Sequence, residues 1–212
     1  AGLTLDVASA ALSEVVIEPA TPEEIEGTVK VMGGEDWLLW IQALKEAGLL
    51  ADGARTVAFS YIGPDSTYAI YRSGTLGKAK EHLEATAAEI RRLMAPLGGQ
   101  AHVAVCKALI TRASSVIPIM SVYVCAMYKV MKAKGLHEGC LAQMDRLFRE
   151  RLYAGGETPV DSQGRIRVDD WELRPDVQAE IASILSRVNQ ENLAELTDPD
   201  GCRKDLMALY GF

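Results

Sequence analysis

Three tyrosines and one lysine lie close together in the chain, and their side chains could donate a proton or stabilise a negative charge. They are Tyr61, Tyr68, Tyr71 and Lys80. A free phenol has a pKa of about 10 and therefore remains a hydrogen-bond donor at neutral pH. A nearby ammonium group stabilises the phenolate, lowers that pKa and makes release of the proton easier. These residue types suit proton donation to a substrate and stabilisation of charge on a carbonyl oxygen.

The spacing of Tyr71 and Lys80 restricts how the two residues can act together. Nine residues at about 100° each place the two side chains on opposite faces of one regular helix. They can converge only if Tyr71 precedes the helix, and Gly74 and Gly77 allow the backbone to turn there. A pair with this spacing also arises by chance. The alternative interpretation is a half-buried loop tyrosine and a solvated helical lysine.

The segment around these residues predicts a strand, a loop and a long helix. Residues 56–59 are a short β-favouring run, and the turn formers at 63–66 end it. An amphipathic helix is predicted from near Thr75, because apolar residues then recur at helical spacing. A site built this way would lie beyond the carboxyl end of a strand, where open α/β sheets bind ligands. The apolar positions are Leu76, Ala79, Leu83, Ala87, Ile90 and Met94.

A second strand is predicted at 102–106, and it leads into Lys107, the segment 108–111 and Ser114. The crossover of roughly 40 residues between the two strands favours parallel pairing with a right-handed connection. The hydroxyl residues after this strand could contact a ligand, or they could cap the next helix.

The rest of the chain predicts mainly helices. Thr21 and Glu24 form a capping-box pattern at the start of the first one. Trp37, Trp40, Ile41 and Leu44 are expected to form a core-facing stripe, whereas Asp169, Asp170 and Arg174 are expected to be caps and surface charges. The expected ranges are a strand at 14–18, helices at 22–32, 35–47, 116–130, 136–153, 175–187, 189–196 and 200–209, and a strand or hairpin arm at 165–168.

Composition argues against several classes of protein. With 22 basic and 29 acidic residues the net charge is -7, so no basic surface for nucleic acid is expected. The four cysteines form no C-x-x-C pair and the three histidines are scattered, which favours reduced cysteines, a cytoplasmic protein and no zinc site. The longest lipophilic stretch, 116–130, is shorter than the ~20 residues of a membrane span. We also expect no signal peptide.

Several stretches resemble NADH-dependent trans-2-enoyl-CoA reductases, which are also classed as enoyl-[acyl-carrier-protein] reductases. The resemblance extends from about Leu3 to Phe212. It implies an α/β fold that is the carboxyl-terminal part of a Rossmann-like, short-chain-dehydrogenase-related parallel sheet with many added helices. The stretches are SYIGPDSTYAIYRSGTLGKAKEHLEATA, VKVMGGEDWLLWIQAL, KALITRASSVIPIMSVYVCAMYKVMKAKGLHEGC, RIRVDDWELRPDVQAE and LYGF.

The resemblance also implies a reaction and roles for individual residues. NADH would reduce the trans-2 double bond of an enoyl-CoA or an enoyl-acyl carrier protein, in fatty acid biosynthesis. Tyr71 matches the proton donor of the family, and Lys80 matches the lysine that holds the cofactor ribose and tunes the tyrosine. Tyr61 matches a residue that contacts the substrate. Leu109, Ile110 and Thr111 match a short segment that contacts the cofactor.

No glycine-rich phosphate loop follows any predicted strand. We therefore expect residues 1–212 to be a single region, the catalytic and acyl-substrate half of a larger reductase. The amino-terminal dinucleotide-binding half would be absent, and that half or a complementing subunit would be a partner.

Two other interpretations remain open at this stage. A short-chain dehydrogenase with another carbonyl substrate usually separates its tyrosine and lysine by four residues, and no such pair follows Tyr68 or Tyr71. A non-catalytic module that binds acyl-CoA or a protein is disfavoured by the joint presence of Tyr61, Tyr71 and Lys80.

Overall fold

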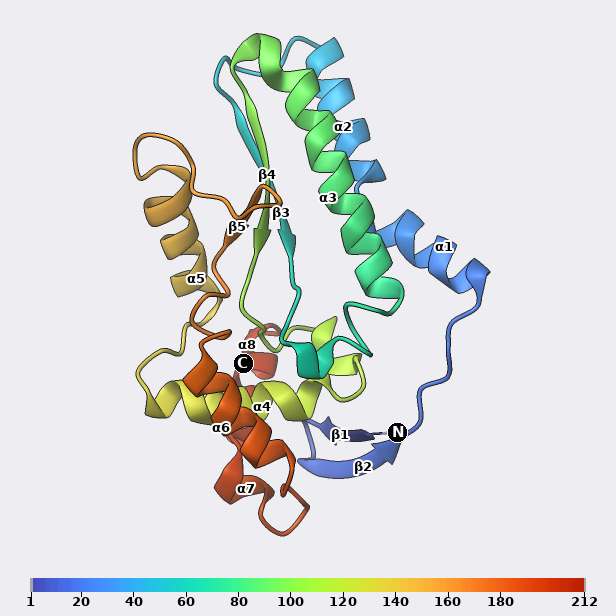
Figure 1. Ribbon diagram of the computed structural model, residues 1–212, viewed down its shortest axis with the longest axis vertical. Helices are drawn as coiled ribbons and strands as arrows, with labels where there is room; N and C mark the ends of the chain where they lie inside the picture. Colours follow the sequence, from blue (N-terminus) through green and yellow to red (C-terminus); the bar gives the residue numbers. More distant parts are fainter. Residues whose placement is uncertain (1, 212) are drawn as a thin grey trace.

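Three parallel strands form the sheet that carries the candidate site (Figure 1). In the computed structural model, which describes residues 2–211, β3 (Arg55–Ser60) pairs with β4 (Gln100–Val105). β4 in turn pairs with β5 (Arg165–Arg167). The parallel α/β sheet is therefore confirmed, and β5 is a parallel strand rather than a hairpin arm. Ala1 and Phe212, at the ends of the region considered above, lie outside the described residues.

The long helix α3 (Thr75–Met94) connects β3 to β4 and begins at the predicted residue. Its buried residues repeat at helical spacing, so that one face packs on the sheet. Leu83 and Ala87 pack against Val103 of β4. Helix α3 therefore holds its first turns, which include Lys80, near the carboxyl end of β3 (Figure 1).

Two helices precede the sheet, α1 (Pro22–Met32) and α2 (Glu35–Glu46), close to the predicted ranges. The capping box at Thr21 is present, with hydrogen bonds in both directions to Glu24. The expected apolar stripe of α2 is only partly correct. Ile41 is buried against α3, but Trp40 is 64% exposed. Helical spacing identifies the apolar face of α2, whereas the width of its contact with α3 decides which residues of that face are buried.

Helix α4 (Met120–Ala133) is the centre of the largest core and is almost wholly buried. Figure 1 shows it lying across the end of the sheet toward which β3 and β4 run. It starts four residues later than predicted, after Ile119, which has a left-handed φ of 70°. Helices α6 (Pro175–Leu185), α7 (Leu193–Leu196) and α8 (Pro199–Ala208) follow in the last quarter of the chain, and α6 and α8 contact α4.

Two expected elements differ from the structure. The strand expected at 14–18 is instead β2 (Ala11–Val15), which pairs antiparallel with β1 (Gly2–Asp6), and residues 16–20 are irregular. Pairing with β1 decides these bounds, because Val15 pairs with Gly2 whereas residues 16 and 17 of the apolar run have no partner strand. The helix expected at 136–153 begins only at Cys140, as α5 (Cys140–Arg146), and continues as a π-helical turn at Leu147–Leu152.

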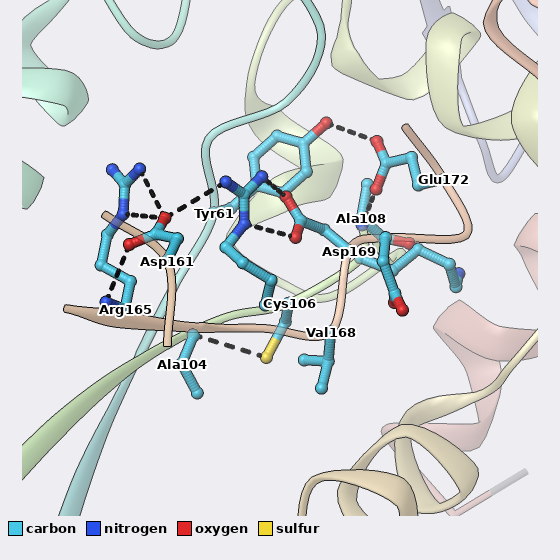
Figure 2. A network of polar contacts seen from close by, with 12 residues as sticks. Tyr61, Ala104, Cys106, Ala108, Asp161, Arg165, Val168, Asp169 and Glu172 are labelled. Carbon is cyan, nitrogen blue, oxygen red and sulfur yellow. Dashed lines mark hydrogen bonds and ion pairs between the residues drawn. The ribbon is translucent and has the colours of Figure 1, made fainter. Parts of the chain in front are cut away.

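Of the two acidic residues after β5, Asp170 is exposed as expected, whereas Asp169 is not the surface charge that was expected. Asp169 is buried and pairs with Arg167 at 2.6 Å (Figure 2). The exposed Asp170 pairs with Arg146 at 2.7 Å. Arg146 also binds Glu138 at 2.8 Å, so a buried ion network joins α5 to the segment after β5. Arg174 behaves as predicted, as the N-cap of α6 with an exposed charge. Among residues 2–211 no helix has the length and apolar character that crossing a membrane requires.

Candidate active site

Tyr61 lies directly beyond the carboxyl end of β3, as the strand prediction requires. Its hydroxyl donates a hydrogen bond of 2.9 Å to Glu172 Oε1, from the segment after β5 (Figure 2). Burial, followed by the charge of Glu172, raises the pKa of Tyr61 well above its ordinary value. Tyr61 is therefore a neutral phenol at all working pH values, because both causes oppose ionisation.

Tyr71 packs against Tyr61. Their ring centroids are 5.0 Å apart and the ring planes are nearly perpendicular, an edge-to-face contact. Tyr71 lies in the irregular segment before α3, as the spacing argument requires, and its side chain is only 7% exposed. Unlike the hydroxyl of Tyr61, that of Tyr71 makes no side-chain hydrogen bond within residues 2–211. Its single hydrogen is therefore available to a ligand.

The pKa of Tyr71 differs from the expectation. We expected the ammonium group of Lys80 to lower it, but burial raises it to about 12. Burial also lowers the pKa of Lys80, with the Cys106 thiol acting weakly in the opposite sense. Desolvation is the leading cause for both groups, and neither group is among the causes of the other's pKa shift.

Lys80 reaches back from α3 to the end of β3. Its Nζ lies 3.5 Å from the carbonyl oxygen of Phe59, which is a weak hydrogen bond. Next to Phe59, the Ser60 hydroxyl is buried and has no hydrogen-bond partner within the described residues. The end of β3 thus presents a poorly satisfied ammonium group and an unsatisfied hydroxyl, both of which would gain from a polar ligand.

The segment from Lys107 to Thr111 follows β4 and is held by buried side chains. The backbone N–H of Lys107 donates to Gln143, and that of Ala108 donates to Glu172, each at 2.7 Å. Ser114 accepts from the N–H of Thr111 at 2.8 Å and donates to the carbonyl of Leu109 at 2.7 Å. Ser114 therefore holds this loop together and does not cap α4, the alternative role that the sequence left open, because the N-cap of α4 is Ile119.

The three residues predicted to contact a cofactor have different environments. Thr111 is exposed and Leu109 is half-buried. Ile110 packs into the core around α4, and its backbone N–H lies 3.4 Å from the Tyr128 hydroxyl. Only Leu109, Thr111 and the backbone of this segment are open to a ligand in this arrangement.

Sequence reasoning missed three residues of this site: Ser60, Tyr123 and Glu172. Tyr123 of α4 donates a 2.7 Å hydrogen bond to the same oxygen of Glu172 that Tyr61 uses. No local pattern marks Glu172, which lies 111 residues beyond Tyr61. Ser60 could have been noticed, because it is a hydroxyl residue at the end of a predicted strand.

Solved structures with the same fold cover this chain completely. The chain superimposes on Treponema denticola trans-2-enoyl-CoA reductase in complex with NAD with a TM-score of 0.94 and 51% identity, over 53% of that protein. It superimposes on the Clostridium acetobutulicum trans-2-enoyl-CoA reductase in complex with NAD with a TM-score of 0.95 and 45% identity, over 55% of that protein. These likenesses confirm the Rossmann-like fold class.

A curated relative matches over a similar share of its length. The Flavobacterium johnsoniae enoyl-[acyl-carrier-protein] reductase [NADH] is 54% identical over 209 residues, which are 99% of this chain and 53% of that protein. The chain therefore spans about half the length of the curated relatives that it matches.

Residues 160–212 match a family model described as an enoyl reductase FAD-binding domain. The described side chains do not fit a flavin dinucleotide. Arg165 and Arg167 are already paired with acidic side chains, and β5 is followed by buried Asp169 rather than by a glycine-rich phosphate loop. The cavity beside Asp161 and Arg167 has a volume of about 240 Å³, below the roughly 300–1,000 Å³ of ordinary ligand pockets.

Residues 1–153 match the model of the trans-2-enoyl-CoA reductase catalytic region, which is well over half of the chain. This match includes all the tyrosines and the lysine from which the site was predicted. The chain belongs to the trans-2-enoyl-CoA reductase family.

Proposed function

We propose that this chain is the catalytic and acyl-substrate part of an NADH-dependent reductase of enoyl thioesters, either enoyl-CoA or enoyl-acyl carrier protein. The observation that carries the proposal is Tyr71, a largely buried residue that packs on Tyr61 beyond the carboxyl end of β3 and whose hydroxyl has no hydrogen-bond partner in the described chain. The names of relatives that are about half identical support the same reaction class.

The residues at the end of β3 fit a nicotinamide cofactor. Lys80 would hold the ribose hydroxyls, because its ammonium group is partly desolvated and has, within residues 2–211, only one weak protein acceptor. The unsatisfied Ser60 hydroxyl and the exposed Thr111 offer further polar groups on the same side of the sheet. When bound, NADH would supply the hydride for the β-carbon of the substrate.

Two phenols would act on the thioester. Tyr71 would donate the proton that completes the reduction at the α-carbon, since its hydrogen is not used within the described chain. Tyr61 would contact the thioester oxygen, where negative charge develops during the reaction. Their edge-to-face packing holds both hydroxyls in one region and restricts rotation of either ring.

We further propose a role in fatty acid biosynthesis and a cytoplasmic location, in line with the acyl-carrier-protein substrates in the names of relatives. Residues 1–212 act as one region in this proposal. They require a dinucleotide-binding half, or a complementing subunit, for turnover, because no strand here is followed by a phosphate loop.

The function is tested with a chimeric enzyme, defined as the Treponema denticola reductase with its matching segment replaced by residues 1–212. We expect this enzyme to oxidise NADH only when crotonyl-CoA is added and to release butyryl-CoA in equal amount. The parent enzyme is the positive control. A well-folded chimeric enzyme that leaves crotonyl-CoA unchanged would exclude the proposed reaction.

Replacement of Lys80 by methionine should weaken NADH binding and turnover together. The loss of charge-assisted hydrogen bonds to the ribose is expected to raise the Kd of NADH about tenfold or more. Fluorescence titration of NADH against the chimeric enzyme measures this change. Lys78→Met is the matched control, because Lys78 is exposed on the same helix and pairs with Glu81. An unaltered Kd in Lys80→Met would remove Lys80 from the cofactor site.

A further inference from the structure

Glu172 is a fully buried carboxyl group at the candidate active site, and the proposed reaction assigns it no role. Three donors converge on it. Oε1 accepts a hydrogen bond from Tyr61 at 2.9 Å and Oε2 accepts one from the Ala108 N–H at 2.7 Å (Figure 2). Oε1 also accepts a hydrogen bond from Tyr123 at 2.7 Å. Glu172 thereby joins the chain after β5 to the segments that follow β3 and β4.

The number of hydrogens at this site determines their directions. Gln178 of α6 donates to the Tyr123 hydroxyl oxygen at 3.0 Å, so Tyr123 must direct its own hydrogen to Glu172. An ionised carboxylate has no hydrogen of its own, so Tyr61 must also direct its one hydrogen to Glu172. In this arrangement Tyr61 faces a ligand with lone pairs only and cannot donate to a thioester oxygen.

We propose that Glu172 is a positioning residue that controls the direction of the Tyr61 hydrogen. As a carboxylate it holds that hydrogen, and once it has taken up one proton from water it releases Tyr61 to donate to the thioester oxygen. The O–H bond formed on Glu172 replaces one broken in a solvent hydronium ion, which becomes water, and no covalent bond of substrate or cofactor changes. The inference rests on the proposed function for the identity of the acceptor, but the direction of the hydrogen can be tested separately.

The charged surroundings of Glu172 are mixed. The titratable groups that face it are Tyr61, Tyr123 and the buried ammonium group of Lys107. Burial raises the pKa of Glu172, and its hydrogen bonds together with Lys107 act in the opposite sense. Glu172 is therefore protonated at a higher pH than an exposed glutamate. The pH at which the Tyr61 hydrogen becomes free to donate to the substrate is correspondingly closer to neutral.

The Glu172→Gln variant places a hydrogen on the Tyr61 side, as the protonated carboxyl does, although the amide carries two hydrogens and the carboxyl only one. The Ala108 N–H requires an acceptor, so the amide oxygen of the glutamine must face it. The amide NH₂ group then points to the two phenols and donates to them. Tyr61 becomes an acceptor on that side, and its own hydrogen is free at every pH.

The first measurement uses the 212-residue chain and no substrate. Tyrosine labelled with ¹³C at Cζ is followed by NMR at neutral pH, with signals assigned from the Tyr61→Phe, Tyr68→Phe and Tyr123→Phe variants. In Glu172→Gln we expect the Tyr61 and Tyr123 signals to move, because each phenol changes from donor to acceptor, whereas the Tyr68 signal stays. Unchanged Tyr61 and Tyr123 signals would overturn the inference.

The second measurement uses the chimeric enzyme with crotonyl-CoA. Glu172→Gln is expected to lower KM about threefold to tenfold, the effect of one hydrogen bond, and to leave the Kd of NADH unchanged. In a Tyr61→Phe background the same substitution should have no effect on KM. Tyr123→Phe is the control, because it removes the other phenol from Glu172 and should not lower KM. An equal effect with and without the Tyr61 hydroxyl would show a general structural role and contradict the inference.

If Glu172→Gln fails to fold, the inference is tested by the pH dependence of the KM for crotonyl-CoA in the chimeric enzyme that retains Glu172. Its KM should fall as pH decreases toward the raised pKa of Glu172, and this trend should be absent in Tyr61→Phe. A KM trend that persists in Tyr61→Phe would overturn the inference. A chimeric enzyme that binds crotonyl-CoA but never reduces it would contradict the proposed function and not the role of Glu172. The NMR measurement tests that role without any turnover.

Discussion

Replacement of Tyr71 by phenylalanine is expected to lower the turnover of the chimeric enzyme by roughly 10²–10⁴, the usual contribution of a positioned general acid. The ring, which is buried and packs on Tyr61, is retained, and only the unused hydroxyl is lost. Binding of NADH should change little, because Lys80 and Ser60 remain. Steady-state oxidation of NADH with crotonyl-CoA, together with the Kd of NADH, measures both effects.

Tyr68→Phe is the matched control for this experiment. Tyr68 lies in the same irregular segment, is half-buried, and has no assigned role. Its loss should leave turnover within about twofold, as for ordinary surface substitutions. Turnover in Tyr71→Phe equal to that in Tyr68→Phe would remove Tyr71 from the mechanism.

The raised pKa of Tyr71 gives this assignment a dependence on pH. Because burial raises the pKa of the phenol to about 12, Tyr71 stays protonated and able to donate through neutral and mildly alkaline pH. Turnover should therefore show no decline from this group until pH approaches that value. If bound cofactor brings the Lys80 ammonium group close to the Tyr71 hydroxyl, the pKa of Tyr71 would fall. The decline in turnover would then begin at a lower pH.

The 212-residue chain by itself is expected to show no NADH-dependent reduction of crotonyl-CoA. Tight binding of a dinucleotide in such folds relies on backbone N–H groups at a helix N-terminus that faces the pyrophosphate. Lys80 and the segment 109–111 can contact only the ribose and nicotinamide end. Without pyrophosphate contacts the Kd should be about millimolar or weaker, which corresponds to about -4 kcal/mol.

This expectation is checked by comparing the chain alone with the chimeric enzyme at equal concentration. Circular dichroism and thermal unfolding confirm that the isolated chain is folded, so that lack of activity reflects weak cofactor binding. Adding the remaining part of the Treponema denticola enzyme as a separate chain should restore turnover if the two parts associate. Steady NADH oxidation by the lone chain would contradict the requirement for a second part.

Much of the site's framework followed from short-range patterns in the sequence. Helical spacing located the start of α3 at Thr75, and the geometry of Tyr71 and Lys80 required Tyr71 to precede it, as it does. The parallel pairing of β3 and β4 followed from the length of their connection. These features depend on residues within a few turns of one another, or on chain length, and both can be read directly.

Tertiary structure decided which polar groups meet. Glu172 contacts Tyr61 across 111 residues and Tyr123 across 49, and its position depends on how the segment after β5 packs against α4. Asp169 was expected on the surface, yet its pairing with Arg167 allows it to be buried. Likewise, β2 takes its bounds from β1 rather than from its own apolar run. A carboxylate in an apolar or charged stretch has no local signal of burial, because burial becomes favourable only when distant donors satisfy it.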